Sequence, residues 1–246
     1  MSATTASACS IEPTETARVL RMIDGVTLEL FDNRIVRLEG LGAPRAPARA
    51  GSDTNWPIEN RAREYAGAIV TGQRVDISST DQPDRYGRVI GQVFLADGTW
   101  VNGALVRGGM ARVETQSDQT RCASEALMLE DIARTGTRGM WALSAYAIHA
   151  PEESAGFTND FQIVEGMVVS VAEVRGRIYL NFGEDYRTDF TVTIAPSDMR
   201  RFEAVGLDPL SLVNARIRVR GWLEFFNGPM IEASHPEQLE LLESEL

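Results

Sequence analysis

The 246-residue chain contains no lysine, so arginine supplies all 24 of its cationic side chains. Every cation is therefore a planar fork that can bind two oxygens at once. Acidic residues outnumber arginine by 35 to 24, which gives a net charge of −11. Residues 1–155 carry 16 Arg against 20 acidic residues, and the rest carries 8 against 15, so the second part is the more acidic. Because such a field repels polyphosphates, the composition argues against a general nucleic-acid binder.

Long apolar runs are also missing. No stretch approaches the roughly 18 apolar residues that a membrane helix needs, although 43% of the residues are hydrophobic. We therefore predict no membrane span. The N-terminal string MSATTASACS lacks the apolar centre of a signal peptide, but it fits a mature form whose signal has been removed.

Cysteine is scarce, and Cys9 and Cys122 lack the paired spacing of a zinc site. They are either two thiols or one disulfide. Cys9 lies in a polar segment where a buried free thiol has no apolar surroundings, so we predict the disulfide. A bridge of this kind favours a periplasmic or secreted location, with a cytoplasmic protein carrying two idle thiols as the alternative. The two histidines, His149 and His235, have no ligand-type neighbours and receive no role.

Short alternating segments with Gly and Asn turns predict a small closed barrel in the first part of the chain, after an N-terminal tail over residues 1–15. A three-stranded meander turns at Asp24-Gly25 and Asp32-Asn33. The further expected elements are a loop over 44–58, a helix over 59–72, strands over 73–80 and 88–100, and helices over 101–110 and 122–141.

A linker is predicted over residues 147–160, where periodicity stops. Strand patterns then return, and Asn227-Gly228 is typical of a hairpin turn. The expected elements are strands over 161–174, 177–183 and 189–195, a helix over 196–206 and a hairpin over 215–233. Three strands, a helix and a hairpin predict an OB-like barrel over 161–246. The fold class is thus mainly β with helices (α+β), with two barrels in tandem.

The segments MIDGVTLEL, VRLEGLGAPR, DRYGRVIGQVFLADGTWVNGALVRGGMARV and RGMW lie between residues 17 and 141. In order and spacing they resemble the staphylococcal-nuclease (thermonuclease) family, and DRYGR with its DGTWVNGALVRGG continuation is the specific part. The resemblance implies an oligonucleotide-binding (OB) type of barrel over residues 16–146.

The resemblance also implies a calcium-dependent nuclease site, and here the chain departs from the family. The family holds calcium with an Asp in the first strand turn and with an Asp and a Thr carbonyl after the third strand, and a Glu acts as base. Calcium needs several oxygen ligands, and a base must deprotonate the attacking water. These positions are Val26, Gly42, Ala43 and Arg45 in this chain. We therefore expect no calcium cofactor and assign no confident catalytic residue.

Two positions match the family's phosphate clamp, namely Arg37 and Arg88. Together with Arg45 they predict a pocket for phosphate or another anion, because guanidinium donors fit two phosphate oxygens. The alternative is that each arginine closes an internal ion pair. Strand alternation then makes Glu39 the partner of Arg37. Glu39 is also a candidate relocated base or metal ligand.

Other residues favour structural roles. Asp24 and Thr27 are expected to shape their turn. The stretch 114–117, where the family places aromatic rings over a nucleotide, reads Glu-Thr-Gln-Ser, so the stacking surface is expected to be lost. In the second barrel we interpret two groups as structural: aromatic core residues (Tyr179, Phe182, Tyr186, Phe190, Trp222) and a polar rim network (Asp185, Arg187, Asp189, Asn227, Glu232).

The leading hypothesis is a non-catalytic, nuclease-derived interaction or scaffold protein with a protein partner and an Arg-lined pocket for phosphate or a nucleotide. The first alternative is an active nuclease or phosphodiesterase with a rearranged site. The second alternative is a single-stranded nucleic-acid binder.

Overall fold

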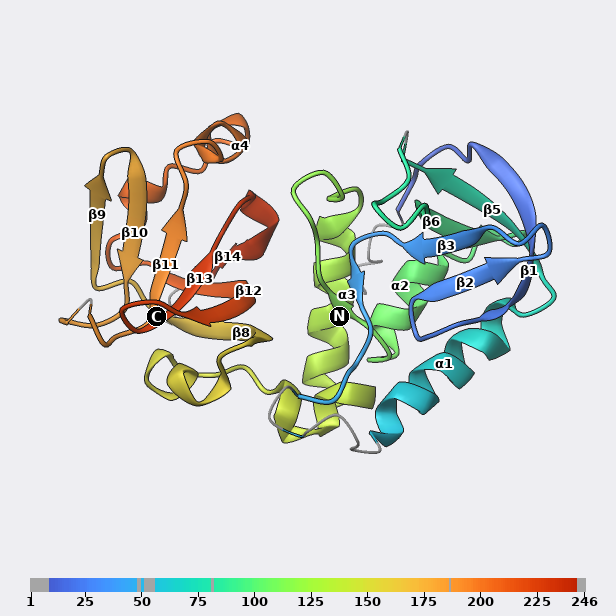
Figure 1. The fold of residues 1–246 in the computed structure, drawn as a ribbon, viewed down its shortest axis with the longest axis horizontal. Coiled ribbons are helices and arrows are strands. Elements are labelled where there is room, and N and C mark those ends of the chain that lie inside the picture. The colour runs from blue at the N-terminus through green and yellow to red at the C-terminus, as the bar shows by residue number, and fades with distance from the viewer. Residues whose placement is uncertain (1–8, 48–49, 51–55, 81, 186, 243–246) are drawn as a thin grey trace, which may run out of the picture. The chain divides into compact units, whose positions relative to one another are not determined.

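The computed structural model describes residues 9–47, 50, 56–80, 82–185 and 187–242. The chain divides into two compact units, Met1–Ser144 and Ala145–Leu246. Each unit has a β-sheet of its own (Figure 1), so the predicted mixed α+β class is confirmed. Among the helices of the described residues, none has both the length and the hydropathy that crossing a membrane requires.

The first unit is built on a closed barrel of five strands, as predicted, and the ring order is β1-β2-β3-β6-β5. All neighbours in the ring are antiparallel except β3 and β6, which run parallel. Inward side chains alternate with outward ones, so Val36 and Leu38 are buried inside. The strands are β1 (Glu15–Met22), β2 (Thr27–Leu30), β3 (Ile35–Leu38), β5 (Arg74–Ser79) and β6 (Val89–Leu95).

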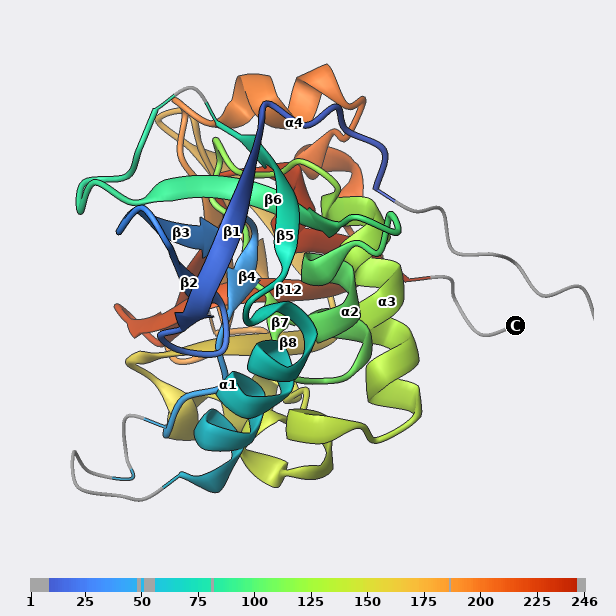
Figure 2. The same ribbon diagram turned by 90° about the vertical axis from the view of Figure 1, so that its right-hand side faces the viewer.

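Three helices pack around this barrel, close to their predicted positions: α1 (Pro57–Val70), α2 (Val101–Arg107) and α3 (Ala123–Thr135). In α1, Pro57 occupies the first turn, where a missing N–H costs nothing. The apolar residues Ile58, Ala62, Ala66 and Val70 are buried at four-residue spacing. Helix α1 packs on β1, α2 on β6 and α3 on α2 (Figure 2). A pair of two-residue strands, β4 (Leu41–Gly42) and β7 (Arg112–Val113), was not predicted, because it is too short to show a period.

The N-terminal tail predicted for residues 1–15 differs from the structure. Residues 1–8 lie outside the described residues, and Cys9 is buried. Cys9 forms the predicted disulfide with Cys122, at a sequence separation of 113. Farther along, Thr14 N donates to Ile77 O at 2.8 Å, and β1 begins at Glu15. Residues 9–15 are therefore attached to the barrel.

The strands of the second unit follow the same ring order as those of the first, if β8 (Asp160–Met167) and β9 (Ser170–Val174) are counted as one bent strand. Strand β8 pairs with β12 (Arg216–Phe225), and β9 pairs with β10 (Arg177–Asn181). Only Val168 and Val169 separate β8 from β9. Val168 N donates to Ala215 O at 2.9 Å and Val169 N to Asn181 O at 2.8 Å, so the pairing changes sides between these two residues. The bent segment closes a ring through β10, β11, β13 and β12, in which β11 and β13 run parallel.

This order is the OB-like topology that three strands, a helix and a hairpin predicted. The elements are β8 (Asp160–Met167), β9 (Ser170–Val174), β10 (Arg177–Asn181), β11 (Thr191–Ile194), α4 (Met199–Ala204), β12 (Arg216–Phe225), β13 (Pro229–Glu232) and β14 (Leu239–Leu241). The short β14, which pairs with β12, was not predicted.

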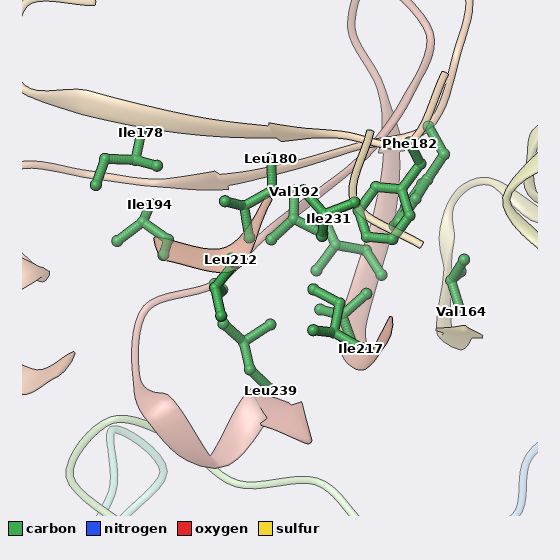
Figure 3. Packing of buried hydrophobic residues seen from close by; sticks show 14 of the residues in the cluster. Val164, Ile178, Leu180, Phe182, Val192, Ile194, Leu212, Ile217, Ile231 and Leu239 are labelled. Carbon is green, nitrogen blue, oxygen red and sulfur yellow. The ribbon is translucent and has the colours of Figure 1, made fainter. Parts of the chain in front are cut away.

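Alternating residues of β10, β11 and β13 fill the core of the second unit (Figure 3). The figure shows Leu180, Val192 and Ile231 turned toward one another. Phe182 and Phe190 also lie in this core, as predicted, with ring centroids 5.0 Å apart. The remaining described aromatics of that prediction, Tyr179 and Trp222, do not lie in the core, because their strand positions face outward; Trp222 is 56% exposed. Tyr186 lies outside the described residues.

The segment predicted as a linker, 147–160, is folded onto the second barrel. It contains a short 3-10 helix, Pro151–Phe157. His149 is buried and stacks on Phe157 with centroids 3.7 Å apart, and His149 N donates to Ile163 O on β8. Aromatic packing thus orders a stretch whose sequence shows no period.

Candidate functional site

Arg37 lies on β3, directly opposite Thr27 on β2. Side chains of opposite residues in an antiparallel pair share a face and are neighbours. One nitrogen of the guanidinium, Nη2, donates to Leu41 O at 2.7 Å. The other, Arg37 Nη1, and the hydroxyl Thr27 Oγ1 are buried, and neither has a hydrogen-bond partner among the described residues.

Two unsatisfied polar atoms on neighbouring strands are costly. An unpaired buried donor or acceptor costs about 1–3 kcal/mol, so native structures keep few of them. The two residues are register partners across β2 and β3, and an N–H donor and a hydroxyl are groups that an anion's oxygens would satisfy. Thr27 was predicted to shape its turn, but its hydroxyl makes no hydrogen bond there among the described residues. Asp24 does act as a turn residue, because its Oδ1 accepts from Val26 N at 2.8 Å.

Charges around the site act on Arg37. Burial lowers the pKa of its guanidinium, and the nearby cations Arg88 and Arg45 lower it further, while Asp24 and Glu114 oppose this shift. Arg88 and Arg45 are therefore each close enough to act on the charge of Arg37. Burial has removed water from the Arg37 cation.

Arg88 has an internal partner, as in the alternative interpretation. Asp84 accepts from Arg88 Nε at 2.7 Å and from Arg88 N at 2.9 Å. Burial raises the pKa of Asp84, but these hydrogen bonds and one from Tyr86 N outweigh it and hold the pKa below its ordinary value. The Arg88 guanidinium also lies over the Tyr86 ring, 5.1 Å from its centroid. Arg88 is thus held in place at the edge of the site.

Glu39 does not pair with Arg37, so that prediction is wrong. β3 ends at Leu38, and the alternation on which the pairing rested does not reach Glu39. The Glu39 side chain is fully buried and accepts from Arg121 Nε at 2.9 Å and from Arg121 Nη2 at 2.5 Å. Arg121 Nη2 also donates to Ser78 O. Through Arg121 the carboxylate is linked to the backbone of β5, and in this arrangement its oxygens are engaged by the guanidinium and are not available as a base or a metal ligand.

The positions that would hold calcium do not fit the ion. Val26 is a buried hydrocarbon and Gly42 has no side chain, so both carboxylate ligands are missing, and Ala43 offers only its backbone carbonyl. Arg45, at the position of the base, carries a positive charge. Within the described residues, no group of three or more His, Cys, Asp or Glu side chains is placed to hold a metal ion.

Glu114 is the site residue that the sequence did not reveal. In the sequence it counted only as one of the positions where the family's aromatic residues are missing. The β4–β7 pair puts Gly42 opposite Arg112, and Arg112 Nη2 lies 3.0 Å from Glu114 Oε2. A Cβ on Gly42 would lie 2.1 Å from Glu114 Oε2. The Glu114 carboxylate thus occupies the space that a side chain at position 42 would need. Because Arg112 and Glu114 are two residues apart, the sequence indicates that they share a strand face. Nothing in the sequence shows that this strand pairs with the segment of Gly42.

Comparison with known proteins agrees with the barrel of the first unit. A family model described as "Staphylococcal nuclease homologue" matches residues 35–143. Two curated relatives, from Escherichia coli and Escherichia coli O157:H7, each carry the name "Uncharacterized endonuclease". Each is 34% identical over 128 residues, which covers 51% of this chain and 76% of the relative.

Proposed function

The chain belongs to the staphylococcal nuclease family, and from this premise we propose that its first barrel binds a phosphate group through Arg37 without calcium-dependent hydrolysis. The ligand class is a nucleotide or the phosphodiester of a nucleic-acid strand. The protein is then a non-catalytic binding or scaffold module. A protein partner stays a prediction.

The pair of unsatisfied atoms, Arg37 Nη1 and Thr27 Oγ1, is the observation that carries this proposal. A phosphate oxygen accepts from both, and a charge-assisted hydrogen bond to a desolvated guanidinium is stronger than a neutral one. Arg45 adds positive charge where the family has an acid that would repel the anion. The field of the whole chain, at net −11, opposes a long polyanion and favours a small ligand.

Hydrolysis by the family mechanism is not expected, because both carboxylate ligands and the base are replaced. The loss of a general base alone typically costs about 10²–10⁴ in rate. Val26 and Gly42 also remove the oxygens that would hold the metal. These losses support a binding site in place of a catalytic one.

Calorimetric titration of the full chain with a nucleoside 3′,5′-bisphosphate, without calcium, tests the binding. We expect measurable affinity, at least tenfold weaker in Arg37→Ala. Arg61→Ala removes an equal charge from the exposed surface of α1 and serves as the matched control. A flat wild-type titration, or equal losses in both variants, would contradict the proposal.

Thr27→Val gives a second, more specific readout. It removes a buried hydroxyl that has no hydrogen-bond partner among the described residues, so the free protein should be equally stable or more stable. Bisphosphate binding should nevertheless weaken. A variant that loses stability and keeps its affinity would show that the hydroxyl serves the fold and not the ligand.

A second candidate function is phosphodiester hydrolysis by a rearranged site. The curated relatives are named endonucleases, and Glu114 brings a carboxylate into the space beside Gly42. In this alternative Glu114 activates water next to the phosphate bound at Arg37. Cleavage of labelled single-stranded DNA or RNA that disappears in Glu114→Gln, with bisphosphate binding retained, would favour it over the binding module.

We also propose an oxidising compartment, such as the periplasm, as the place of function. The disulfide between Cys9 and Cys122 supports this location. Alkylation under denaturing conditions, followed by intact-mass measurement of protein from its native compartment, tests it. We expect no modified thiol before reduction and two after it. Two modified thiols before reduction would contradict the proposal.

A further inference from the structure

The second barrel has a pocket of about 360 Å³ on the outer face of its sheet. Asn181, Thr191 and Met230 are register partners across β10, β11 and β13 and form one row of this face. The neighbouring residues Leu180, Val192 and Ile231 turn into the core (Figure 3), so the row faces outward. Its main lining residues are Tyr179, Asn181, Thr191, Phe226, Asn227 and Met230.

The turn between β12 and β13 supplies one wall of the pocket. Asn227 and Gly228 adopt left-handed φ values of 51° and 97°, and Phe226 N donates to Gly228 O at 2.9 Å. A Cβ on Gly228 would lie 2.8 Å from Asp189 O in the β10–β11 loop, so only glycine permits this approach. The turn is thus packed in place and holds Phe226 at the pocket, although the residue is 69% exposed.

Polar side chains on the pocket floor keep hydrogen-bonding capacity. Thr191 and Asn181 are 6% and 9% exposed. Asn181 Nδ2 donates to Ser170 Oγ at 3.2 Å, and Asn181 Oδ1 accepts from Thr191 Oγ1 at 3.4 Å. A side-chain amide has a second N–H and a second acceptor position, so the floor can still bond a ligand's hydroxyl groups.

Charge decides the class of ligand. Among the described residues that line the pocket, none is charged. The chain after residue 155 carries 15 acidic residues against 8 Arg, which repels phosphate polymers. The sheet face and hairpin loop of OB barrels take oligonucleotides or oligosaccharides, and only the second class suits a neutral pocket in an acidic unit.

We propose that this pocket binds a neutral oligosaccharide. The rings of Tyr179 and Phe226 pack against the C–H faces of sugar rings, as aromatic side chains do with apolar surfaces. Asn181, Thr191 and Asn227 bond the hydroxyl groups. This site is separate from the phosphate site of the first barrel and does not depend on it.

Calorimetry of the full chain with maltohexaose and with chitohexaose, as α- and β-linked probes, tests the proposal. We expect at least one of them to bind, and Phe226→Ala to weaken binding about tenfold or more. Phe225→Ala is the matched control, because Phe225 is 66% exposed, adjacent and not among the pocket's lining residues. An equal effect of both variants, or no heat from either sugar at millimolar concentration, would overturn the proposal.

A single-stranded oligonucleotide is the third probe. If the second barrel is a nucleic-acid site, Phe226→Ala will weaken oligonucleotide binding and Arg37→Ala will not, and that result would also overturn the proposal. Oligonucleotide binding that only Arg37→Ala weakens belongs to the first barrel and leaves the second barrel as a sugar site.

Discussion

The two barrels of this chain share a strand order and differ in what they present to a ligand. Each closes through a parallel pair, β3 with β6 and β11 with β13. The first, however, places Arg37 opposite Thr27 on one face of its sheet, and the second surrounds a neutral pocket with aromatic and amide side chains. If both proposals hold, the same topology carries two recognition chemistries, because outward side chains, and not the ring of strands, decide the ligand.

The barrels also differ in what holds them together. A disulfide and the buried pair of Glu39 with Arg121 secure the first. The second has no cysteine. Besides its hydrocarbon core it holds a buried ion pair of its own, in which Arg220 Nη2 lies 2.5 Å from Glu240 Oε1. If this contrast is correct, a perturbation of one barrel should shift one unfolding transition and leave the other unchanged.

Reduction of the disulfide should give the largest effect. The crosslink closes a loop of sequence separation 113, and for a loop near 100 residues the chain-entropy contribution is about 4.7 kcal/mol, as an upper value. We expect a lower melting temperature for the first unit only, in calorimetric scans with and without reductant. A variant with both cysteines replaced by serine is the control, because reductant should not change its scan. A shift of both unfolding transitions would contradict the view that the disulfide stabilises the first unit alone.

Arg121→Ala should come next. It leaves the Glu39 carboxylate, whose side chain is fully buried, without its cation. Removing one member of a buried pair costs about 3–5 kcal/mol. Chemical denaturation should show this loss in the first unit, and the double variant with Glu39→Gln should recover part of it. A loss under about 1 kcal/mol, as for surface pairs, would show that water reaches the pair.

Leu180→Ala tests the core of the second barrel. The side chain is fully buried among Val192 and Ile231 (Figure 3). A Leu→Ala change in such a core costs about 2–5 kcal/mol. The second transition should move and the first should not. Bisphosphate binding should stay at the wild-type level, and its loss would show that the two units depend on each other.

The smallest effect is expected at Asp84. Its pKa is held below the ordinary value of 3.8, so it stabilises the folded state at pH values above 3.8 and loses this contribution as pH falls through the lowered value. The pair with Arg88 is partly exposed and contributes about 0.2–1 kcal/mol. Asp84→Asn should remove that amount at pH 7 and flatten the acid end of a stability-against-pH curve. An unchanged acid slope would contradict the assignment.

Much of both barrels could be predicted from the sequence, because alternation and turn residues are local signals. The helices around residues 57–70 and 123–135 follow from spacing and glycine stops. The pairing of β4 with β7 could not be predicted, since two residues show no period. The folded segment 151–157 was missed for a similar reason: its order comes from packing of His149 on Phe157.

The candidate site was predictable only in part. The family motif identified Arg37, Arg45 and Arg88. The burial that leaves Arg37 Nη1 without a hydrogen-bond partner among the described residues is visible only in the three-dimensional structure. Glu39 was given the wrong partner because alternation was carried past the end of β3. Glu114 was missed because its position beside Gly42 depends on a long-range pairing.

The first barrel is proposed to keep a phosphate site without the calcium-dependent reaction. Labelled single-stranded DNA incubated with the full chain at millimolar calcium, then separated by size, tests this most directly. We predict full-length substrate at all times, with the wild type and Arg37→Ala indistinguishable. Calcium-dependent shortening that Arg37→Ala abolishes would contradict the proposal.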